Sequence, residues 1–323
     1  MSNLSKDSET VICQSQCSDI KRPTPAFLAL PGRQSTLGTG LTISRVLPNT
    51  KLRMVGPWCF LDHIGPVTFS ATDMIDVAPH PHIGLQTATW MIEGELLHKD
   101  SLGYTQVIRP GQLNLMTAGH GISHSEESPE GRSPNVHGVQ FWIALPKHKK
   151  DIDADFEHFP QLPMRQYSRS FFTLFIGEHD GMASPATTHS PILGAEIVSP
   201  NADALALPLD TSFEYALMVI AGEAELDIDG EAKVLVPNSV YYLGGSRDQI
   251  LLKTKDNTRI MLIGGEPFAQ PVSLWWNFVG HSNEDIHQAK QDWENSDRFG
   301  EVKAYTKGTR LSAPELTPTT RVR

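Results

Sequence analysis

Two separated pairs of side chains in the first half of the sequence have the residue types of a metal centre. His80 and His82 flank Pro81, and His124 is followed two positions later by Glu126. In an extended segment residues i and i+2 point to the same face, so each pair can direct both side chains into one barrel. Three imidazoles and one carboxylate suit a single divalent transition metal. The sequence therefore predicts a metal site formed by these four side chains.

The neighbouring residues favour this interpretation. Pro81 fixes its own φ and stiffens the first pair, while Gly119 and Gly121 permit a tight, irregular approach to the second pair. A single His-x-His often has a purely structural origin, but two such pairs in one β-rich region are hard to explain as coincidence. Buried histidine and carboxylate clusters otherwise lose hydration free energy without compensation.

Short β-like runs surround both pairs, and Gly, Pro and Asp separate them. In the first half these runs cover residues 41–47, 87–92, 105–108, 112–116 and 139–145. A second β-rich block follows between residues 171 and 263. Short strands with turn residues between them are typical of a barrel or sandwich and not of βαβ units.

The two β-rich blocks resemble each other. Residues 90–95 (WMIEGE) precede a proline turn at 109–111, and residues 218–223 (MVIAGE) precede another at 236–239. A repeat of roughly 130 residues is far longer than a solenoid unit, so it indicates two similar domains. The predicted organisation is a flexible leader over 1–22, a metal-binding domain over 23–150, a linker over 151–164, a second domain without metal ligands over 165–270, and a C-terminal strand, helix and tail over 271–323.

The C-terminal region contains one clear helix signal. Ser282 is a plausible N-cap before acidic residues, and the helical pattern continues to about Asn295. The segment from Thr306 to Arg323 is rich in Pro, Thr and Arg, so we expect a loosely docked tail.

Composition excludes several classes of protein. With 27 Lys and Arg against 37 Asp and Glu, the net charge is −10, which disfavours direct binding to nucleic acid or to an anionic membrane. No apolar run approaches the roughly 18–20 residues of a spanning helix, and the polar N-terminus lacks a signal-peptide core. Three cysteines (Cys13, Cys17 and Cys59) cannot form a disulfide framework, so we expect a cytoplasmic protein. Cys13 and Cys17 are predicted to be solvated thiols, since a structural zinc site needs four ligands.

Four segments of the chain resemble the pirin family, a two-barrel group within the cupin superfamily. They are residues 60–63 (FLDH), 79–87 (PHPHIGLQT), 116–126 (MTAGHGISHSE) and 140–146 (QFWIALP). The resemblance implies an all-β fold of two tandem cupin barrels, each a double-stranded β-helix or jelly roll, followed by a C-terminal helix. It also implies a mononuclear Fe(2+) site in the first barrel, with Mn, Ni, Co, Cu or Zn as alternative metals. The family's metal ligands fall on His80, His82, His124 and Glu126.

Two residues depart from the family pattern. Gln86 stands where family members usually have a Glu that is not a ligand, so metal binding should survive. His120 is unexpected at its position, and we favour a surface histidine over a polar group at the mouth of the site. In the second block His179 and His189 lie in a loop-like stretch.

Other polar residues receive less specific interpretations. Gln140 is predicted to face the first barrel interior, where its amide would orient a ligand histidine. For Trp142 a position in the barrel lining and ordinary core packing are equally good explanations. The isolated histidines are expected to be surface or satisfied core residues, except that Asp62 and His63 could border the pocket. These isolated histidines are His63, His98, His137, His148 and His158.

The resemblance implies two functions of different kinds. The first is a quercetin 2,3-dioxygenase-type enzyme acting on a flavonol or similar aromatic, with open metal positions for substrate and O₂ and Glu126 as general base. The second is a redox-sensitive regulatory binding protein without turnover, a transcription co-regulator or a modulator of metabolic enzymes, with a protein partner. A third interpretation is a cupin whose metal only braces the barrel.

Overall fold

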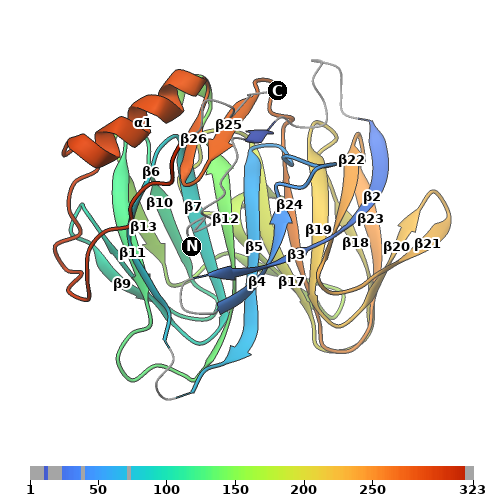
Figure 1. Cartoon of the computed structure of the whole chain (residues 1–323). Helices are drawn as coiled ribbons and strands as arrows, with labels where there is room; N and C mark the ends of the chain where they lie inside the picture. Colours follow the sequence, from blue (N-terminus) through green and yellow to red (C-terminus); the bar gives the residue numbers. More distant parts are fainter. Residues whose placement is uncertain (1–10, 14–23, 38–40, 71–73, 317–323) are drawn as a thin grey trace.

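The computed structural model describes residues 11–13, 24–37, 41–70 and 74–316. The predicted leader and Cys17 lie outside this part, except for strand β1 (Val11–Cys13), as do residues 317–323. Two β-barrels stand side by side, and helix α1 lies across one end of the first (Figure 1). The predicted all-β fold with two tandem barrels and a C-terminal helix is confirmed.

The first barrel consists of two antiparallel sheets. The larger sheet has the strand order β13 (Asp155–Phe159), β10 (Leu113–Thr117), β7 (Leu85–Glu93), β12 (Asn135–Ala144), β5 (Trp58–Thr68), β4 (Leu41–Leu47) and β3 (Arg33–Leu37). The smaller sheet has the order β6 (Asp76–His82), β11 (Ile122–Glu127), β8 (Leu96–Asp100) and β9 (Thr105–Ile108). A short 3-10 helix, η1 (Lys147–Lys149), follows β12.

The second barrel repeats this arrangement. Its larger sheet has the order β14 (Met164–Tyr167), β15 (Ser170–His179), β17 (Ile192–Ser199), β24 (Thr258–Gly265), β19 (Glu214–Ala221), β22 (Ser239–Gly245) and β2 (Pro25–Pro31), and β16 (Met182–Ala183) pairs with β15. Its smaller sheet has the order β18 (Asp203–Pro208), β23 (Gln249–Thr254), β20 (Ala224–Ile228) and β21 (Glu231–Leu235). Because β18, β19, β23 and β24 pair as β6, β7, β11 and β12 do, the structure has the internal repeat that the sequence indicated.

The edge strands of the two larger sheets come from unexpected parts of the chain. Strand β2 lies within the segment predicted to belong to the first domain, yet it pairs with β22 of the second barrel. Residues 151–164, predicted as a linker, contain β13, which pairs with β10 of the first barrel. β2 and β13 therefore hold matching edge positions in the two barrels. Pairing across this sequence distance cannot be seen in local residue patterns.

The larger sheets of the two barrels pack against each other through aromatic residues. The Trp58 ring contacts Phe141 and Phe175, with ring centroids 5.0 and 6.3 Å away. Trp58 Nε1 donates to the carbonyl of Gly264 at 2.9 Å, so its polar atom is also satisfied across the junction. This buried contact joins the barrels through a shared hydrophobic core.

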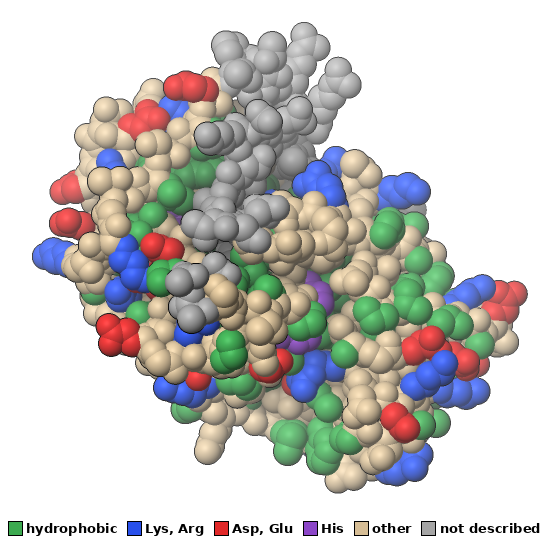
Figure 2. Space-filling view, turned by 60° about the horizontal axis from the view of Figure 1, so that its bottom comes forward, with side chains coloured by type: hydrophobic (Ala, Val, Ile, Leu, Met, Phe, Trp, Pro, Cys, Tyr) green, Lys and Arg blue, Asp and Glu red, His purple; other side chains and the backbone are tan. Residues whose placement is uncertain are grey.

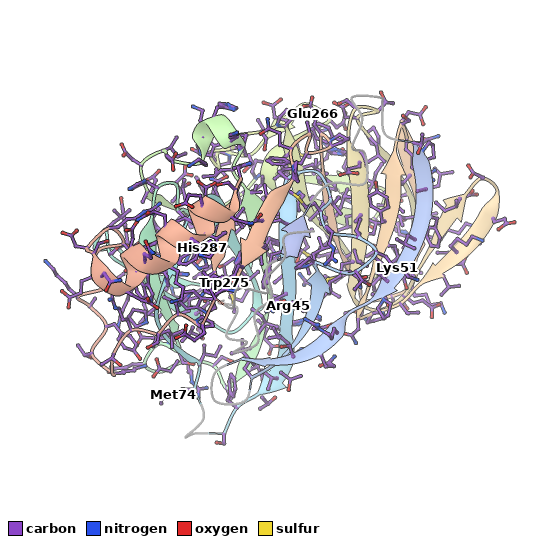
Figure 3. All side chains as sticks on the ribbon, turned by 45° about the horizontal axis from the view of Figure 1, so that its top comes forward. Arg45, Lys51, Met74, Glu266, Trp275 and His287 are labelled. Atoms are coloured by element: carbon purple, nitrogen blue, oxygen red, sulfur yellow. The ribbon has the colours of Figure 1, made fainter. Side chains whose placement is uncertain are left out.

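The C-terminal region covers one end of the first barrel. Strands β25 (Val272–Trp275) and β26 (Phe278–Gly280) form a small sheet with β1. Helix α1 (Asn283–Asn295) begins where Ser282 Oγ accepts the backbone N–H of Asp285 at 3.1 Å, which confirms the predicted N-cap. The helix packs into the same cluster as Trp275, which Figure 3 labels near the helix.

The first part of the predicted loose tail is in fact docked. The backbone N–H of Leu311 donates to the carbonyl of Pro79 at 2.8 Å. Lys307 Nζ lies 2.9 Å from a carboxylate oxygen of Glu127, the last residue of β11. For residues 306–316 the prediction of a loose tail was wrong, because these contacts are made to strands distant in the sequence.

The surface carries mixed charge. Figure 2 shows Lys and Arg side chains interspersed with Asp and Glu over the visible face. Within the described ranges no helix has the length and apolar character that crossing a membrane requires.

Candidate metal centre

Strands β6 and β11 place the predicted ligands beside one another. The two strands are antiparallel neighbours, with His80 opposite His124 and His82 opposite Ile122. A register shift after His124 places Glu126 opposite Val77. The alternation of a strand directs His80 and His82 to the same face, as the sequence predicted.

Three of the four predicted side chains form a compact cluster. One ring nitrogen from each of His80, His82 and His124 lies within 4.8 Å of the other two. Nε2 of His82 is 3.1 Å from Nε2 of His124, and the three residues are at most 1% exposed. Among the residues that the structure describes, no other group of three or more His, Cys, Asp or Glu side chains has its ligand atoms within 4.8 Å of one another.

Glu126 lies beside this cluster but is not a member of it. The residue is 2% exposed, and its Oε1 accepts the amide N–H of Gln140 at 2.8 Å. Its position as the fourth ligand stays a prediction. Gln140 was expected to orient a ligand histidine, and the structure corrects this: its amide contacts Glu126 and the hydroxyl of Thr89.

Backbone carbonyls fix the orientation of the first two imidazoles. His80 Nδ1 lies 2.9 Å from the carbonyl oxygen of Ala78, and His82 Nδ1 lies 2.9 Å from that of Asn277. Because a carbonyl can only accept, each Nδ1 carries the hydrogen and each Nε2 keeps its lone pair. The lone pairs are therefore left for a ligand inside the barrel.

A second histidine orients His124. Nδ1 of His124 lies 3.3 Å from Nδ1 of His98, whose Nε2 lies 2.9 Å from a carboxylate oxygen of Asp100. The carboxylate requires a hydrogen on His98 Nε2, so His98 Nδ1 accepts the hydrogen of His124 Nδ1 and leaves His124 Nε2 unprotonated. Oδ1 of Asp100 also accepts the backbone N–H groups of Leu102 and Tyr104 at 2.9 and 3.0 Å.

The role of His98 was missed in the sequence, where it was taken for an ordinary histidine. The available signal was the His98-x-Asp100 spacing, since it matches the i, i+2 pattern of the ligand pairs, although no strand was predicted over these residues. The pairing of β8 with β11 places this dyad against His124 and gives it a role.

Electrostatics favour neutral imidazoles in the cluster. Burial lowers the pKa of His80 to about 4, although the nearby Glu126 carboxylate and the Ala78 carbonyl oppose this. Burial, followed by the neighbouring histidines, holds the pKa values of His82 and His124 well below the usual range. Neutral nitrogens with free lone pairs are the form that binds a transition metal.

The donor set therefore fits a transition metal. His80 Nε2 is buried and makes no hydrogen bond, which is costly for a polar atom unless a ligand satisfies it. Three imidazole nitrogens close together, with a carboxylate beside them, match the preferences of divalent first-row metals. The residues present fit the group that the sequence predicted.

Aromatic residues border the cluster. The ring centroid of Trp142 lies 5.1 Å from that of His82, and the Trp142 ring stacks on Phe60 with centroids 4.0 Å apart. Both interpretations of Trp142 are therefore correct, since the ring packs in the core and also contacts a ligand histidine. Trp142 Nε1 and Gln140 Oε1 are buried and make no hydrogen bond, so both can serve a bound molecule.

Asp62 and His63, considered as pocket residues, have partners of their own. Arg45 Nε and Nη2 donate hydrogen bonds to the two carboxylate oxygens of Asp62, at 2.8 and 2.7 Å. His63 Nε2 lies 2.7 Å from His137 Nε2. Asp62 and His63 are neighbours on β5 and point to opposite faces of the strand, so they cannot both border the metal pocket.

The two departures from the family pattern have structural explanations. The side chain of His120 is 61% exposed and 4.0 Å from Asp151, which agrees with a surface histidine. The Gln86 amide donates to Thr117 Oγ1 and to the carbonyl of Thr187, at 3.0 and 3.1 Å. It thus links the first barrel to a loop of the second half of the chain.

The fold and this site define a two-barrel cupin protein with a histidine-rich metal centre in the first barrel. Residues 40–143 match the family model described as Pirin, and residues 195–300 match the model described as Pirin C-terminal cupin domain. The chain belongs to the pirin family.

Relatives of known name support this assignment. A Pseudomonas aeruginosa protein named "Putative quercetin 2,3-dioxygenase" is 48% identical over 286 residues, which are 88% of this chain and 89% of that protein. A "Pirin-like protein" of Caulobacter vibrioides is 38% identical and spans 83% of this chain and 92% of its own length. The crystal structure of a quercetin 2,3-dioxygenase from Acinetobacter baumannii is 44% identical, with a TM-score of 0.87 over 91% of this chain and 97% of that one.

Proposed function

We propose that this protein is an iron-dependent oxygenase of the quercetin 2,3-dioxygenase type that acts on flavonol-like substrates. The observation that carries the proposal is the cluster of three buried imidazoles whose Nε2 lone pairs face one another beside the Glu126 carboxylate. The names of relatives in Pseudomonas and Acinetobacter support the reaction type and the substrate class.

The metal would be held by His80, His82 and His124, with Glu126 as the fourth ligand. Iron(II) bound there supplies Lewis-acid chemistry and a place for O₂ to react with the substrate. Four protein ligands would leave positions open on an octahedral iron ion, whereas on a tetrahedral ion the same four would form a closed structural site.

The protein's own side chains have clear tasks around the metal. Glu126 follows His124 by two residues and its carboxylate acts electrostatically on His80, so it is the candidate base for the hydroxyl proton of a flavonol. Gln140 fixes one carboxylate oxygen by its hydrogen bond at 2.8 Å and thereby orients the base. Trp142 and Phe60 provide an aromatic wall suited to a flat aromatic substrate.

The test is oxygen uptake by iron-loaded protein with quercetin as the substrate. Glu126→Gln should lower turnover by about 100-fold or more while iron is retained. Glu127→Gln is the matched control, because the neighbouring carboxylate pairs with Lys99 and Lys307 instead of facing the cluster. We expect that variant to keep turnover within about threefold of the unmodified protein, since it removes no group from the site.

Metal analysis separates the possible outcomes. If iron-loaded protein consumes no O₂ with flavonols, the proposed function is overturned. If Glu126→Gln turns over normally, the base is another group. Loss of iron together with turnover in that variant would identify Glu126 as a ligand and leave the base role unsupported.

A further inference from the structure

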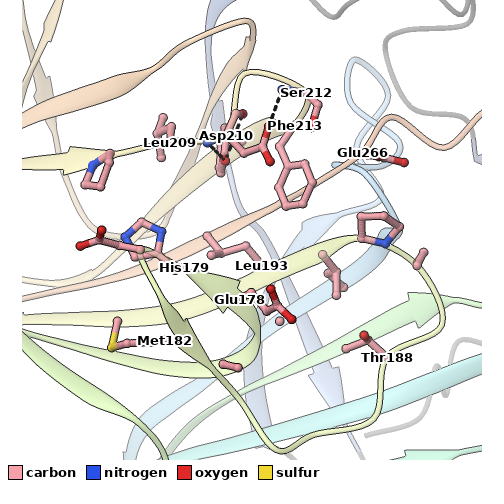
Figure 4. A pocket seen from close by; sticks show the side chains of 18 of the residues that line it. Glu178, His179, Met182, Thr188, Leu193, Leu209, Asp210, Ser212, Phe213 and Glu266 are labelled. Atoms are coloured by element: carbon pink, nitrogen blue, oxygen red, sulfur yellow. Dashed lines mark hydrogen bonds between the residues drawn. The ribbon is translucent and has the colours of Figure 1, made fainter.

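The second barrel contains a cavity of about 820 Å³ that the metal chemistry does not use. Its walls come from the ends of β15 and β18, the starts of β17 and β19, and the turns between them (Figure 4). The volume lies within the range of roughly 300–1,000 Å³ that is usual for small-molecule sites.

The cavity lies at the end of the barrel that corresponds to the metal centre. Pro208 ends β18 and Leu209 follows it, and both line the cavity. In the first barrel His82 ends β6, the matching strand. This end of the second barrel therefore has a ligand-sized space where the first barrel has its histidine cluster.

His179 supplies a buried polar group without a partner. The residue is 8% exposed, lines the cavity, and stacks on Phe172 with ring centroids 4.5 Å apart. Its Nε2 makes no hydrogen bond. Burial lowers the pKa of His179, so the ring is neutral at pH 7 and offers a lone pair. A ligand with a hydrogen to donate would satisfy it.

The polar residues of the cavity give it a negative charge. Glu178, Asp210 and Glu266 line it from three different segments, and Figure 4 labels all three. No Lys or Arg is among the described lining residues. The remaining acid, Asp180, already pairs with Arg165. The uncompensated carboxylates favour a cation over a neutral or anionic molecule.

The arrangement does not suit a bare metal ion. His179 and these carboxylates do not bring three ligand atoms within 4.8 Å of one another; among the described residues only the histidine cluster of the first barrel does so. Ile192, Leu193 and Phe213 add an apolar wall to the same cavity. A molecule with both a charged group and an apolar body would contact both parts.

We propose that this cavity binds a small organic cation, a protonated amine on an apolar or aromatic body. The ammonium group donates to the imidazole nitrogen of His179, and the carboxylates that line the cavity, Glu178 and Glu266 among them, stabilise its charge at longer range. The apolar body lies against Leu193 and Phe213. Nothing in this site depends on the metal of the first barrel.

A series of indoles that differ only in charge tests the proposal. Binding to metal-loaded protein is measured by calorimetry at low salt and pH 7.5, with tryptamine as the cation, tryptophol as the neutral analogue and indole-3-propionate as the anion. Tryptamine should bind about tenfold more tightly than tryptophol, and indole-3-propionate more weakly still. Higher salt should reduce the difference, because the carboxylates are exposed to solvent.

Variants locate the binding site. Glu178→Gln should weaken tryptamine binding about threefold, and His179→Phe, which retains the stack on Phe172, about fivefold or more. Glu225→Gln removes one charge from β20 of the same barrel, away from the cavity, and should have little effect. Thermal unfolding of each variant verifies that it folds. Because Glu178 is exposed, we expect Glu178→Gln to unfold at the temperature of the parent protein.

Two results would overturn the proposal. One is equal binding, or no binding, of tryptamine and tryptophol. The other is tryptamine binding that both cavity variants leave unchanged but that His80→Ala abolishes, since the amine would then occupy the first barrel. Oxygen uptake with quercetin is scored separately, so failure of this site and failure of the oxygenase function are distinguishable.

Discussion

The two barrels share a strand arrangement but fill matching strands with opposite chemistry. In the first barrel β6 and β11 bring His80 opposite His124. In the second barrel β18 and β23 bring Leu207 opposite Ile250, and both are at most 3% exposed. A row of imidazoles in one barrel is thus replaced by aliphatic side chains in the other. The cupin scaffold forms with either set, so the metal ligands are not a requirement of the fold.

The difference also shows what a polar barrel interior needs. Buried aliphatic side chains contribute hydrophobic free energy and require no partners. Buried imidazoles require hydrogen-bond acceptors, which here are the carbonyls of Ala78 and Asn277 and the ring of His98. One of these acceptors, Asn277, lies in the C-terminal segment that follows the second barrel. The metal centre therefore depends on parts of the chain far from its ligands.

The largest expected effect follows from removing a ligand. His82→Ala should weaken metal binding by about 1,000-fold, because one of few strong donors is lost. Metal competition with a chelator measures the affinity. The metal-free variant should unfold at a temperature close to that of the metal-free parent protein, and a large drop would show that the histidines are structural.

The matching change in the second barrel should lower stability and leave metal binding unchanged. Leu207→Ala leaves a cavity in a fully buried cluster and should lower the free energy of unfolding by about 3 kcal/mol. Urea denaturation measures this loss. Metal stoichiometry should remain that of the parent protein. Loss of metal in the folded variant would mean that metal binding in the first barrel depends on the packing of the second.

A smaller effect is expected from the residue that orients His124. His98→Ala should reduce metal affinity about 10- to 100-fold, since the His98–Asp100 dyad selects the tautomer of the ligand. His98→Asn, which can still accept a hydrogen bond, should recover part of the affinity. Equal affinity in all three proteins would contradict a positioning role.

The smallest effect concerns His63 of β5, which lies against His137 of β12 in the first barrel. Burial, and secondly His137, lower the pKa of His63 to about 4, whereas the unfolded chain titrates near 6.5. The folded state thus excludes a proton that the unfolded state binds, so its stability is complete above pH 6.5 and falls as the pH drops toward 4. The loss at pH 5 should be about 2 kcal/mol.

Urea denaturation at pH 7.5 and pH 5 measures this loss. His63→Gln, which can still contact His137, should show a weaker dependence on pH than the parent protein. The buried histidines of the metal cluster are the same in both proteins, so the difference between them isolates the His63–His137 pair. An identical pH dependence in the two proteins would refute the assignment.

Local patterns were sufficient for the elements and for most of the ligand set. The i, i+2 spacing of His80 and His82 and of His124 and Glu126 follows from strand geometry alone, and the structure brings the three histidines together. Ser282 predicted the start of the helix correctly because capping is a local interaction. The exchange of edge strands, by contrast, depends on β2 reaching β22 across more than two hundred residues, which local patterns cannot encode.

The sequence by itself determined that the chain forms β-strands in two similar blocks and that only the first block carries paired histidines. Those features follow from residue type and periodicity. The tertiary structure alone decided that Asn277 and His98 orient the ligands and that His179 faces a cavity in the second barrel. The physical reason is that these contacts join side chains and carbonyls from separate strands, and their distances exist only once the barrels have closed.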